Sequence, residues 1–219
     1  MIAVPSLAFG ESLYYYHHIK RKPMRYGTDQ KQITRDRVLK AAARQLRERG
    51  PERIGLASVM ADAGLTHGGF YAHFESKDDF LRATVERMFA DSPFAMLRDE
   101  GQSPSEALAK FVDFYLSPGH RDTRVGGCPL PFLAADAPRL PPDIRERLAA
   151  GASTMTRHIA QHLAALGRLD AESEASSCVA EIVGAMTLAR AEPDQSRSDA
   201  MLARSRSAIL RRLTLETCQ

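Results

Sequence analysis

The sequence predicts an all-α protein of about nine helices, and three observations support this fold class. Apolar residues recur at helical spacing along most of the chain. Sustained alternation of apolar and polar residues, which is typical of strands, is not found. Capping residues and prolines stand where the helical runs begin, and glycines stand where several of them end. We therefore expect packed helices without a sheet.

The composition is that of an ordinary globular chain. Of the 219 residues 44% are hydrophobic and 26% are charged, which is enough for one or two domains with a buried core. No run of 18 apolar residues occurs, so no membrane span is expected. The short apolar run at residues 1–10 lacks a basic leader and makes a poor signal peptide. Three widely spaced cysteines argue for a reducing compartment, and we expect a cytoplasmic protein.

Three segments are expected along the chain. Residues 1–30 are irregular and form a separate N-terminal extension, of which residues 1–23 are either a flexible basic arm or the product of a misplaced start codon. Residues 31–76 form a first helical domain and residues 77–219 a second, larger one. We expect helices at about residues 33–49, 56–63, 66–73, 76–92, 104–116, 130–137, 142–166, 170–191 and 197–217, and a loop at 117–127.

Two helix starts are marked by their side chains. Ser76 precedes Asp79 in the S-x-x-D pattern of a capping box. Ser103 combines a cap with a first-turn proline and a reciprocal carboxylate at Glu106. Both helices are therefore expected to begin directly after these serines.

The short helices at 56–63 and 66–73 are joined by a tight turn that is typical of a helix-turn-helix. In that turn Gly64 can take a positive φ angle, Leu65 is the buried apolar residue and Thr66 can cap the second helix. Such a pair suits DNA, because the major groove, about 12 Å wide, admits one helix while the helix behind it sets the angle.

The second of these helices carries two adjacent glycines, Gly68 and Gly69. Each costs about 1 kcal/mol of helix stability relative to alanine, and that cost makes sense where the backbone must come close to another surface. Phe70 and Phe74 lie four residues apart and are expected in the core. Tyr71 lies off that face and can offer its hydroxyl to a phosphate. His67 and His73 are either base or phosphate contacts or ordinary surface histidines.

Charge is distributed unevenly along the chain. Residues 1–82 hold 14 Lys and Arg against 9 Asp and Glu, a net charge of +5, whereas residues 83–219 hold 16 against 18, a net charge of −2. A basic N-terminal third fits a polyanionic partner such as nucleic acid. Scattered charge on a solvated surface remains the alternative on this evidence alone.

From Ala63 through Phe74, and on through Ser76–Leu81, the sequence resembles the DNA-binding domain of the TetR family of bacterial transcriptional regulators. The resemblance covers about residues 33–81. Two positions depart from the family pattern: Gly55 replaces a capping threonine that often contacts phosphate, and Met60 replaces an alanine. The resemblance implies that DNA contacts come from Ala57, Ser58, Thr66, His67, Gly68, Gly69, Tyr71, His73 and Lys77, the last at a helix N-terminus that also attracts phosphate.

The resemblance further implies a C-terminal domain that binds a small ligand and forms a homodimer through the last two long helices. A dimer would place two recognition helices about 34–36 Å apart on a palindromic operator. The function expected is that of a repressor released from double-stranded DNA by a small-molecule or electrophile ligand. The apolar stripes of the last two helices are either core or interface: Val179, Ile182, Val183, Met186, Leu202, Ile209, Leu210 and Leu213.

The candidate ligand-binding residues are aromatic, sulfur-containing or histidine side chains of the second domain, and ordinary core packing is the alternative for each. They are Phe94, Phe111, Phe114, Tyr115, Cys128, Phe132, Met155, His158 and His162. No metal or other cofactor is expected, because no third ligand accompanies His158 and His162.

Cys128 follows two glycines, and Arg121 and Arg124 precede it in a way that would favour a thiolate. A thiolate could sense electrophiles, as in some TetR-like regulators, while a buried inert cysteine is the alternative. A small helical enzyme using this thiol is the competing function, although the sequence lacks a convincing triad partner. A helical interaction module is a third option, and it leaves the glycine-bearing helix unexplained.

Overall fold

The computed structural model describes residues 26–98, 101–123 and 126–215, and within these ranges every regular element is helical. The all-α prediction is therefore confirmed. The α-helices are α1 (Tyr26–Arg49), α2 (Leu56–Asp62), α3 (Lys77–Ala90), α4 (Pro104–Tyr115), α5 (Pro118–Asp122), α6 (Leu130–Leu133), α7 (Pro142–Ala165), α8 (Ala171–Ala191) and α9 (Gln195–Arg212). Four 3-10 helices complete the fold: η1 (Pro51–Arg53), η2 (His67–Ala72), η3 (Pro93–Arg98) and η4 (Ala137–Arg139).

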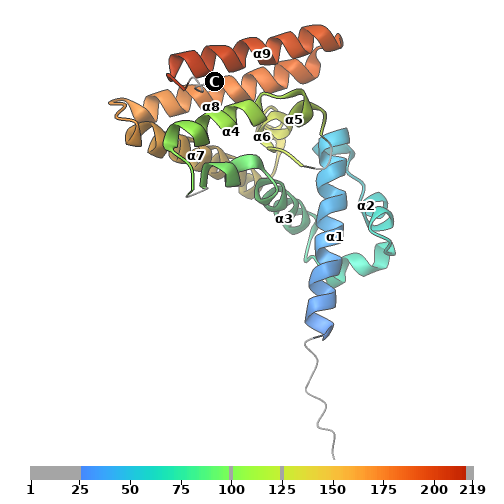
Figure 1. The fold of residues 1–219 in the computed structure, drawn as a ribbon. Coiled ribbons are helices and arrows are strands. Elements are labelled where there is room, and N and C mark those ends of the chain that lie inside the picture. The colour runs from blue at the N-terminus through green and yellow to red at the C-terminus, as the bar shows by residue number, and fades with distance from the viewer. Residues whose placement is uncertain (1–25, 99–100, 124–125, 216–219) are drawn as a thin grey trace, which may run out of the picture.

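The helices form a small N-terminal unit, from α1 to η2, and a larger unit, from η3 to α9, with α3 between them (Figure 1). In the small unit α1 packs against α2, and α2 packs against η2. In the larger unit α7, α8 and α9 lie side by side, and α8 and α9 form its outer edge. Helix α3 contacts both α1 and α7, so it connects the unit that carries the helix-turn-helix to the larger one. None of the helices in the described ranges is long and apolar enough to cross a bilayer.

The expected helix starts are present at both serines. The Ser76 hydroxyl accepts a hydrogen bond from the Asp79 amide at 3.0 Å. The Ser103 hydroxyl accepts from the Glu106 amide, and the Ser103 amide donates to the Glu106 carboxylate at 3.1 Å, which completes the capping box. Each cap satisfies amides that would otherwise lack a partner, and such a cap contributes about 1 kcal/mol.

The helix pattern differs from the predictions at two helix ends, in one divided helix and in one expected loop. Helix α1 begins at Tyr26, within the segment expected to be irregular, and α9 ends at Arg212 rather than near residue 217. The expected helix at 130–137 is divided between α6 and η4. The expected loop at 117–127 contains α5, because Ser117 caps a helical turn that opens with Pro118. The extension at residues 1–25 lies outside the described residues.

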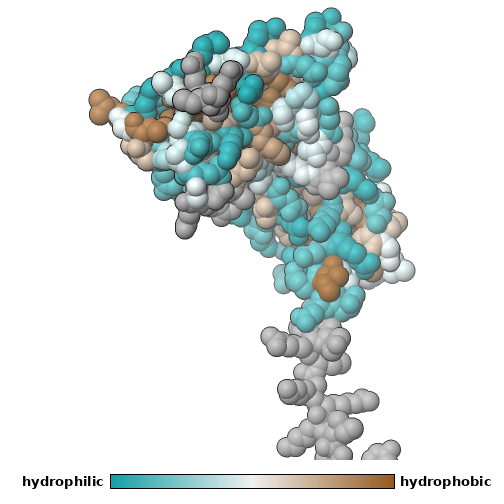
Figure 2. Space-filling view, viewed as in Figure 1, coloured by the Kyte–Doolittle hydropathy of each residue, from teal (hydrophilic) through white to brown (hydrophobic). Residues whose placement is uncertain are grey.

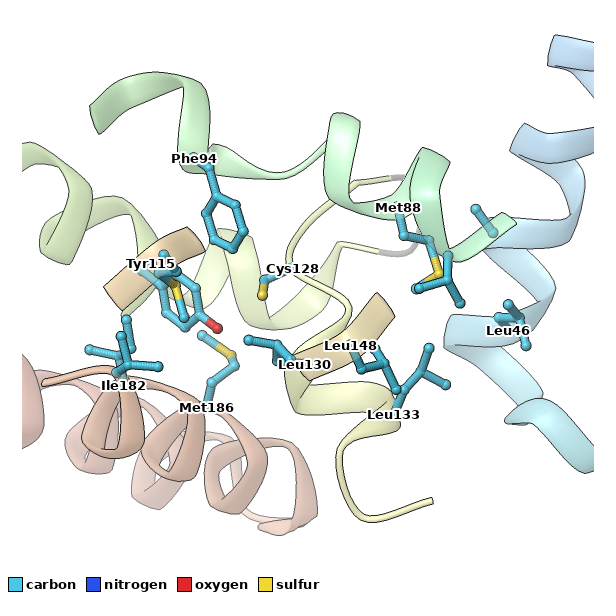
Figure 3. Close-up of a cluster of buried hydrophobic side chains, with 14 of the residues drawn as sticks. Leu46, Met88, Phe94, Tyr115, Cys128, Leu130, Leu133, Leu148, Ile182 and Met186 are labelled. Carbon is cyan, nitrogen blue, oxygen red and sulfur yellow. The ribbon is translucent and has the colours of Figure 1, made fainter. Parts of the chain in front are cut away.

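The two units share one continuous apolar core. Figure 3 shows buried side chains running from Leu46 of α1 past Met88 of α3 to Ile182 and Met186 of α8. At the crossing of α3 and α7, Gly151 lies against the ring of Phe89, where a Cβ atom would stand 2.0 Å from the ring carbon Cζ. The absence of a side chain at Gly151 therefore permits the close contact between α3 and α7.

Candidate nucleic-acid interface

The turn between α2 and η2 is built as its sequence predicts. Gly64 has φ of +72°, a conformation that favours glycine. Its amide donates to the carbonyl of Ala61 at 2.9 Å, and the amide of Leu65 donates to the carbonyl of Met60 at 2.8 Å. These two bonds form a Schellman motif, which satisfies the last carbonyls of α2 and turns the chain into η2.

The element expected as an α-helix over about residues 66–73 is a 3-10 helix, η2, of six residues. Its backbone bonds include Gly69 amide to Thr66 carbonyl at 3.1 Å and His73 amide to Phe70 carbonyl at 2.9 Å. Two glycines weaken α-helical preference, so the tighter form is accessible in the free protein. Thr66 occupies the capping position, but its side chain makes no capping bond, and that part of the prediction is wrong.

Three buried phenylalanines fix the orientation of η2. The ring of Phe70 lies 5.4 Å from that of Phe74 and 5.5 Å from that of Phe80, measured between centroids. All three are buried, as predicted for Phe70 and Phe74. This anchoring turns the intervening Tyr71 outward, where 72% of the residue is exposed. The tyrosine hydroxyl is therefore available to a partner on the outer face of η2.

The two glycines of η2 and the residues before them lie at the surface. Thr66, His67 and Gly68 are exposed, and Gly69 is half-buried. A Cβ atom at Gly68 would meet nothing within 4 Å, and one at Gly69 would lie 3.7 Å from the Met60 methyl group, an ordinary contact. Packing inside the protein therefore does not require either glycine.

His73 lies at the end of η2 and is half-buried. Burial, and then the charges of Lys31 and Arg35, lower the pKa of its imidazole. Arg35 also lies over the ring of Phe74, 4.9 Å from the centroid. These two basic residues of α1 therefore border η2. Neither residue was predicted individually from the sequence, although the positive charge of the N-terminal third indicated basic residues in this part of the chain.

At the start of α2, one of the two predicted DNA contacts already has a hydrogen-bond partner inside the protein. Ala57 is exposed, but the Ser58 hydroxyl already accepts a bond from Gln45 at 2.9 Å. Gln45 is buried in α1 and also donates to Asp62 at 2.9 Å, so it ties α1 to both ends of α2. The Ser58 hydrogen can still donate to a phosphate. Lys77 is exposed at the start of α3, where Asp78 and Asp79 share the first turn.

The candidate ligand-binding residues do not gather around one site. Phe111, Tyr115 and Met155 are fully buried and packed in the core, and Phe114 is exposed on the outside of α4. Phe132 is half-buried beneath the guanidinium of Arg190, 3.6 Å from its ring centroid. His162 Nε2 bonds to the carbonyl of Leu97 at 2.8 Å, which ties α7 to η3.

Two of the candidates, Phe94 and His158, line the same cavity. This cavity, of about 310 Å³, lies between α3, η3 and α7. Its other walls include Phe89, Glu86 and Arg147, so it combines aromatic rings with one acidic and one basic group. Among the residues described, no set of three or more His, Cys, Asp or Glu side chains is placed to hold a metal ion.

Cys128 is buried in the core between Tyr115 and Leu130 (Figure 3). Burial raises the pKa of its thiol to about 11, so the thiol is protonated at neutral pH. Arg121 does not activate it, because that side chain is paired with Asp122 and Asp199. Of the two alternatives for Cys128, the structure favours the buried, inert cysteine over the thiolate, and Arg124 lies outside the described residues. A thiol of this kind gives no support to a thiol-dependent enzyme.

The apolar stripes of the last two helices mostly face inward. Six of the eight residues are buried in the core, and Val183 and Leu210 are half-buried against it. The outward face of α8 is different: it is lined by exposed Ala180, Thr187, Leu188 and Ala191, and 61% of Leu188 is open to solvent. Any interface on α8 would therefore use this second set of residues.

The geometry defines a class of protein. A helix pair joined by a glycine turn carries an exposed, glycine-bearing recognition element next to basic residues of α1, and that is a helix-turn-helix DNA-binding unit. In the view of Figure 2 the surface of this unit is largely hydrophilic.

Comparison with known proteins places the chain within this class. A family model described as bacterial regulatory proteins, tetR family, matches residues 38–84, and one described as the tetracyclin repressor-like C-terminal domain matches residues 104–209. The chain belongs to the TetR family of DNA-binding transcriptional regulators.

Individual relatives agree with this assignment. The transcriptional regulator AcuR of Cereibacter sphaeroides is 26% identical over 167 residues, covering 71% of this chain and 75% of AcuR. The HTH-type transcriptional regulator TtgR of Pseudomonas putida is 33% identical over 60 residues, which cover 27% of this chain and 29% of TtgR.

Solved structures show the same fold. A TetR-family transcriptional regulator from Agrobacterium tumefaciens gives a TM-score of 0.72 at 22% identity, covering 83% of this chain and 98% of the other. Reduced NemR of E. coli gives 0.70 at 21% identity, covering 81% and 95%.

Proposed function

We propose that the protein is a repressor that binds a palindromic operator as a homodimer and leaves it when a small molecule binds. The observation that carries this proposal is the outer face of η2: an exposed tyrosine beside two glycines that internal packing does not require. Thr66, His67, Gly68 and Gly69 would meet the groove. Ala57, Ser58, Tyr71, His73 and Lys77 would meet its phosphate borders.

The dimer would form through α8 and α9. These helices are the outer layer of the larger unit, and α8 presents small side chains and Leu188 on its outward face. Small residues allow two helices to approach closely, and a two-fold pair of α8–α9 layers would form a four-helix interface. Such a dimer would place two η2 elements on the same face of the DNA, about one helical turn apart.

The ligand would enter the cavity between α3, η3 and α7. Its volume of about 310 Å³ is at the lower end of the range for small-molecule sites. Phe89 and Phe94 offer apolar contact, while Glu86, Arg147 and His158 offer charge and hydrogen bonds. A ligand here would separate α3 from α7 and so move η2. The buried, protonated Cys128 favours such a non-covalent ligand over an electrophile.

The test is selection of operator DNA from a library of random duplexes by the full-length protein, followed by a salt titration of binding to the selected sequence. The proposal expects a two-fold symmetric consensus and affinity that falls steeply between about 50 and 200 mM salt, because each neutralised phosphate releases counterions. Selection of no consensus, or binding insensitive to salt, would contradict it. If Tyr71→Phe loses DNA binding while the control Phe114→Leu, at another exposed ring, keeps it, the contact is assigned to η2.

A further inference from the structure

A charged side chain of α1 is buried against the larger unit rather than directed to DNA. Arg47, in the last turn of α1, is only 5% exposed, and its guanidinium donates to the carbonyl of Gly127 at 3.0 Å. Burial lowers the pKa of Arg47 to about 10, opposed by the charge of Asp91 at the end of α3, so the group stays charged at neutral pH. Arginine is rarely buried unless its charge has partners, which points to a specific role for this contact.

The carbonyl that Arg47 reaches is held rigidly. Gly127 has φ of +98°, and a Cβ atom there would stand 2.8 Å from His120 Nε2, so only glycine fits. The amide of Cys128 donates to His120 Nε2 at 3.2 Å, and His120 Nδ1 bonds to the carbonyl of Tyr115 at 2.7 Å. Since an amide only donates and a carbonyl only accepts, His120 is neutral with its proton on Nδ1.

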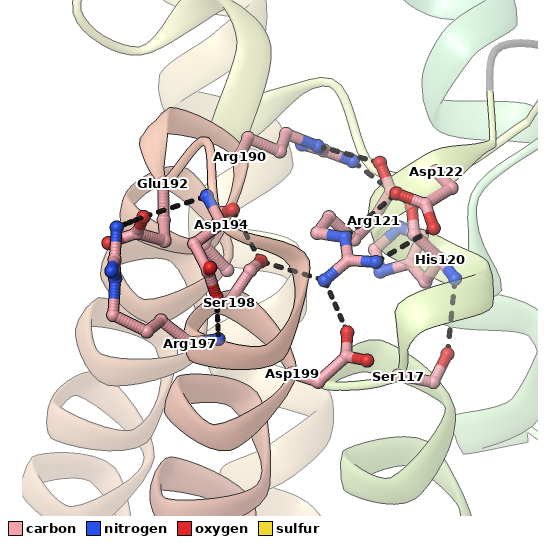
Figure 4. Close-up of polar contacts among 11 residues, drawn as sticks. Ser117, His120, Arg121, Asp122, Arg190, Glu192, Asp194, Arg197, Ser198 and Asp199 are labelled. Carbon is pink, nitrogen blue, oxygen red and sulfur yellow. Dashed lines mark hydrogen bonds and ion pairs between the residues drawn. The ribbon is translucent and has the colours of Figure 1, made fainter.

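The same segment is bound at its other side to the last two helices. We name residues 117–123 together with 126–128 the α5 strut. From the strut, Arg121 donates to Ser198 at 2.7 Å and to Asp199 at 2.5 Å, both on α9. From α8, Arg190 donates to the carbonyls of His120 and Arg121, each at 3.2 Å (Figure 4). The strut therefore links the C-terminal end of α1 to the α8–α9 layer.

In the part of the chain that the structure describes, the DNA-binding unit is joined to the larger unit by the shared apolar core, which includes the packing of α3 on α7, by an exposed ion pair between Glu52 and Arg139 at 3.9 Å, and by the buried bond from Arg47 to the strut. The packing of α3 on α7 alone would leave a hinge at α3, whereas a buried, directional bond at the end of α1 fixes an orientation. We propose that Arg47 is a positioning residue for operator binding, which fixes each η2 element relative to the α8–α9 layer through the α5 strut. This inference rests on the proposed function, because that layer is where the two protomers would meet.

The consequence is a dependence on half-site spacing. A rigid dimer accepts one separation of half-sites, because an added base pair shifts and rotates one site relative to the other. For the wild type we expect a loss of at least about tenfold in affinity when one base pair is inserted at the centre of the selected palindrome. For Arg47→Met we expect weaker binding to the original palindrome and a loss below about threefold on insertion, because the unit can then swing about α3.

The experiment measures binding of each variant to the selected palindrome, to the same sequence with one or two added or removed central base pairs, and to a single half-site. Lys40→Met is the matched control, since it removes one exposed positive charge seven residues earlier on α1. Arg47→Lys should restore most of the spacing dependence, because an ammonium can still donate to the carbonyl of Gly127. Arg121→Met cuts the strut from α9 and tests the same path should Arg47→Met fail to fold.

The proposal is supported if Arg47→Met or Arg121→Met flattens the spacing profile while half-site affinity and dimer mass stay at wild-type values. It is overturned if the folded variants keep the wild-type profile, or if half-site affinity falls as much as affinity for the palindrome. Failure of the proposed function would be visible earlier and separately, because the wild-type protein would then select no palindrome.

Discussion

At the scale of single residues, η2 is defined by what faces inward and what faces out. Phe70 and Phe74 hold it to the core, and their spacing of four predicted this correctly from the sequence. Gly68 and Gly69 face a space that a side chain could occupy without a clash. The pair is therefore best explained by a partner that comes into contact with the backbone of η2.

Substitution at Gly69 tests whether the glycine is needed for folding or for close approach by DNA. Gly69→Leu should leave the melting temperature within a few degrees of wild type, since its Cβ fits beside Met60, yet reduce operator affinity at least about 100-fold by holding the backbone away from the groove. Gly69→Ala, which adds one methyl group, should fall between the two. Gel-shift titration and thermal unfolding measure both effects. Normal operator binding by Gly69→Leu would mean that η2 does not enter the groove.

A second prediction at this scale concerns His120, which is only 1% exposed. The pKa of His120 is lowered from an ordinary value of 6.5 to about 4, mainly by burial, which outweighs the bond to the Tyr115 carbonyl that raises it, and to a lesser extent by the charges of Arg190 and Arg47. Below pH 6.5 the unfolded chain binds a proton that the folded chain excludes, so stability falls as the pH drops toward 4. Above pH 6.5 both states are neutral, and the contribution is constant.

The free energy of unfolding should therefore drop by about 2 to 3 kcal/mol between pH 7.5 and pH 4.5 on account of this residue. Urea titrations at the two pH values measure it. His120→Gln should remove most of this difference, and His67→Gln, at an exposed histidine, should leave it unchanged. An equal pH dependence in the wild type and in His120→Gln would assign the effect to other groups.

At the scale of elements, the sequence predicted well wherever one local rule governs and less well where packing decides. Serine caps, the Gly64 turn and the long apolar periods placed most helices within a few residues. The rules failed at η2, where two glycines leave the choice between α and 3-10 geometry to the surroundings. They also failed at α5, where the Ser117–Pro118 start was present but lay among glycines that suggested a loop.

The crossing of α3 and α7 is an element-scale contact that sequence spacing could not predict, since it joins residues far apart in the chain. Gly151→Ala would place a methyl group 2.0 Å from Phe89 Cζ, and the overpacking should lower the free energy of unfolding by about 1 to 3 kcal/mol. Adding Phe89→Leu to this variant should restore part of the lost free energy, because the space that the ring occupies becomes available to the methyl group. Denaturant unfolding of the single and double variants measures the coupling, and additive losses would show that the two residues do not clash.

At the scale of the whole molecule, the candidate site depends on groups that no periodic pattern could place. Gln45, Arg47 and Arg121 are buried polar residues, and each has a partner that lies between 13 and 80 positions away in the chain. From the sequence alone such residues are expected at the surface, because charged and amide side chains are rarely buried unless they have a partner, and the partner is not known. For the same reason, the sequence alone does not distinguish the buried apolar stripes of α8 and α9 from an interface between protomers.

The outward face of α8 provides the corresponding test of assembly. Leu188→Arg would place a charge at the centre of the proposed two-fold contact, while 61% of the leucine is exposed in the protomer, so folding should be little affected. We expect sedimentation to give the monomer mass and affinity for the palindrome to fall at least about 100-fold, because one protomer can hold only one half-site. Leu169→Arg is the matched control, since Leu169 is fully exposed at the turn before α8 and should change neither quantity. If Leu188→Arg remains a dimer that binds the palindrome normally, the two protomers meet through a different surface.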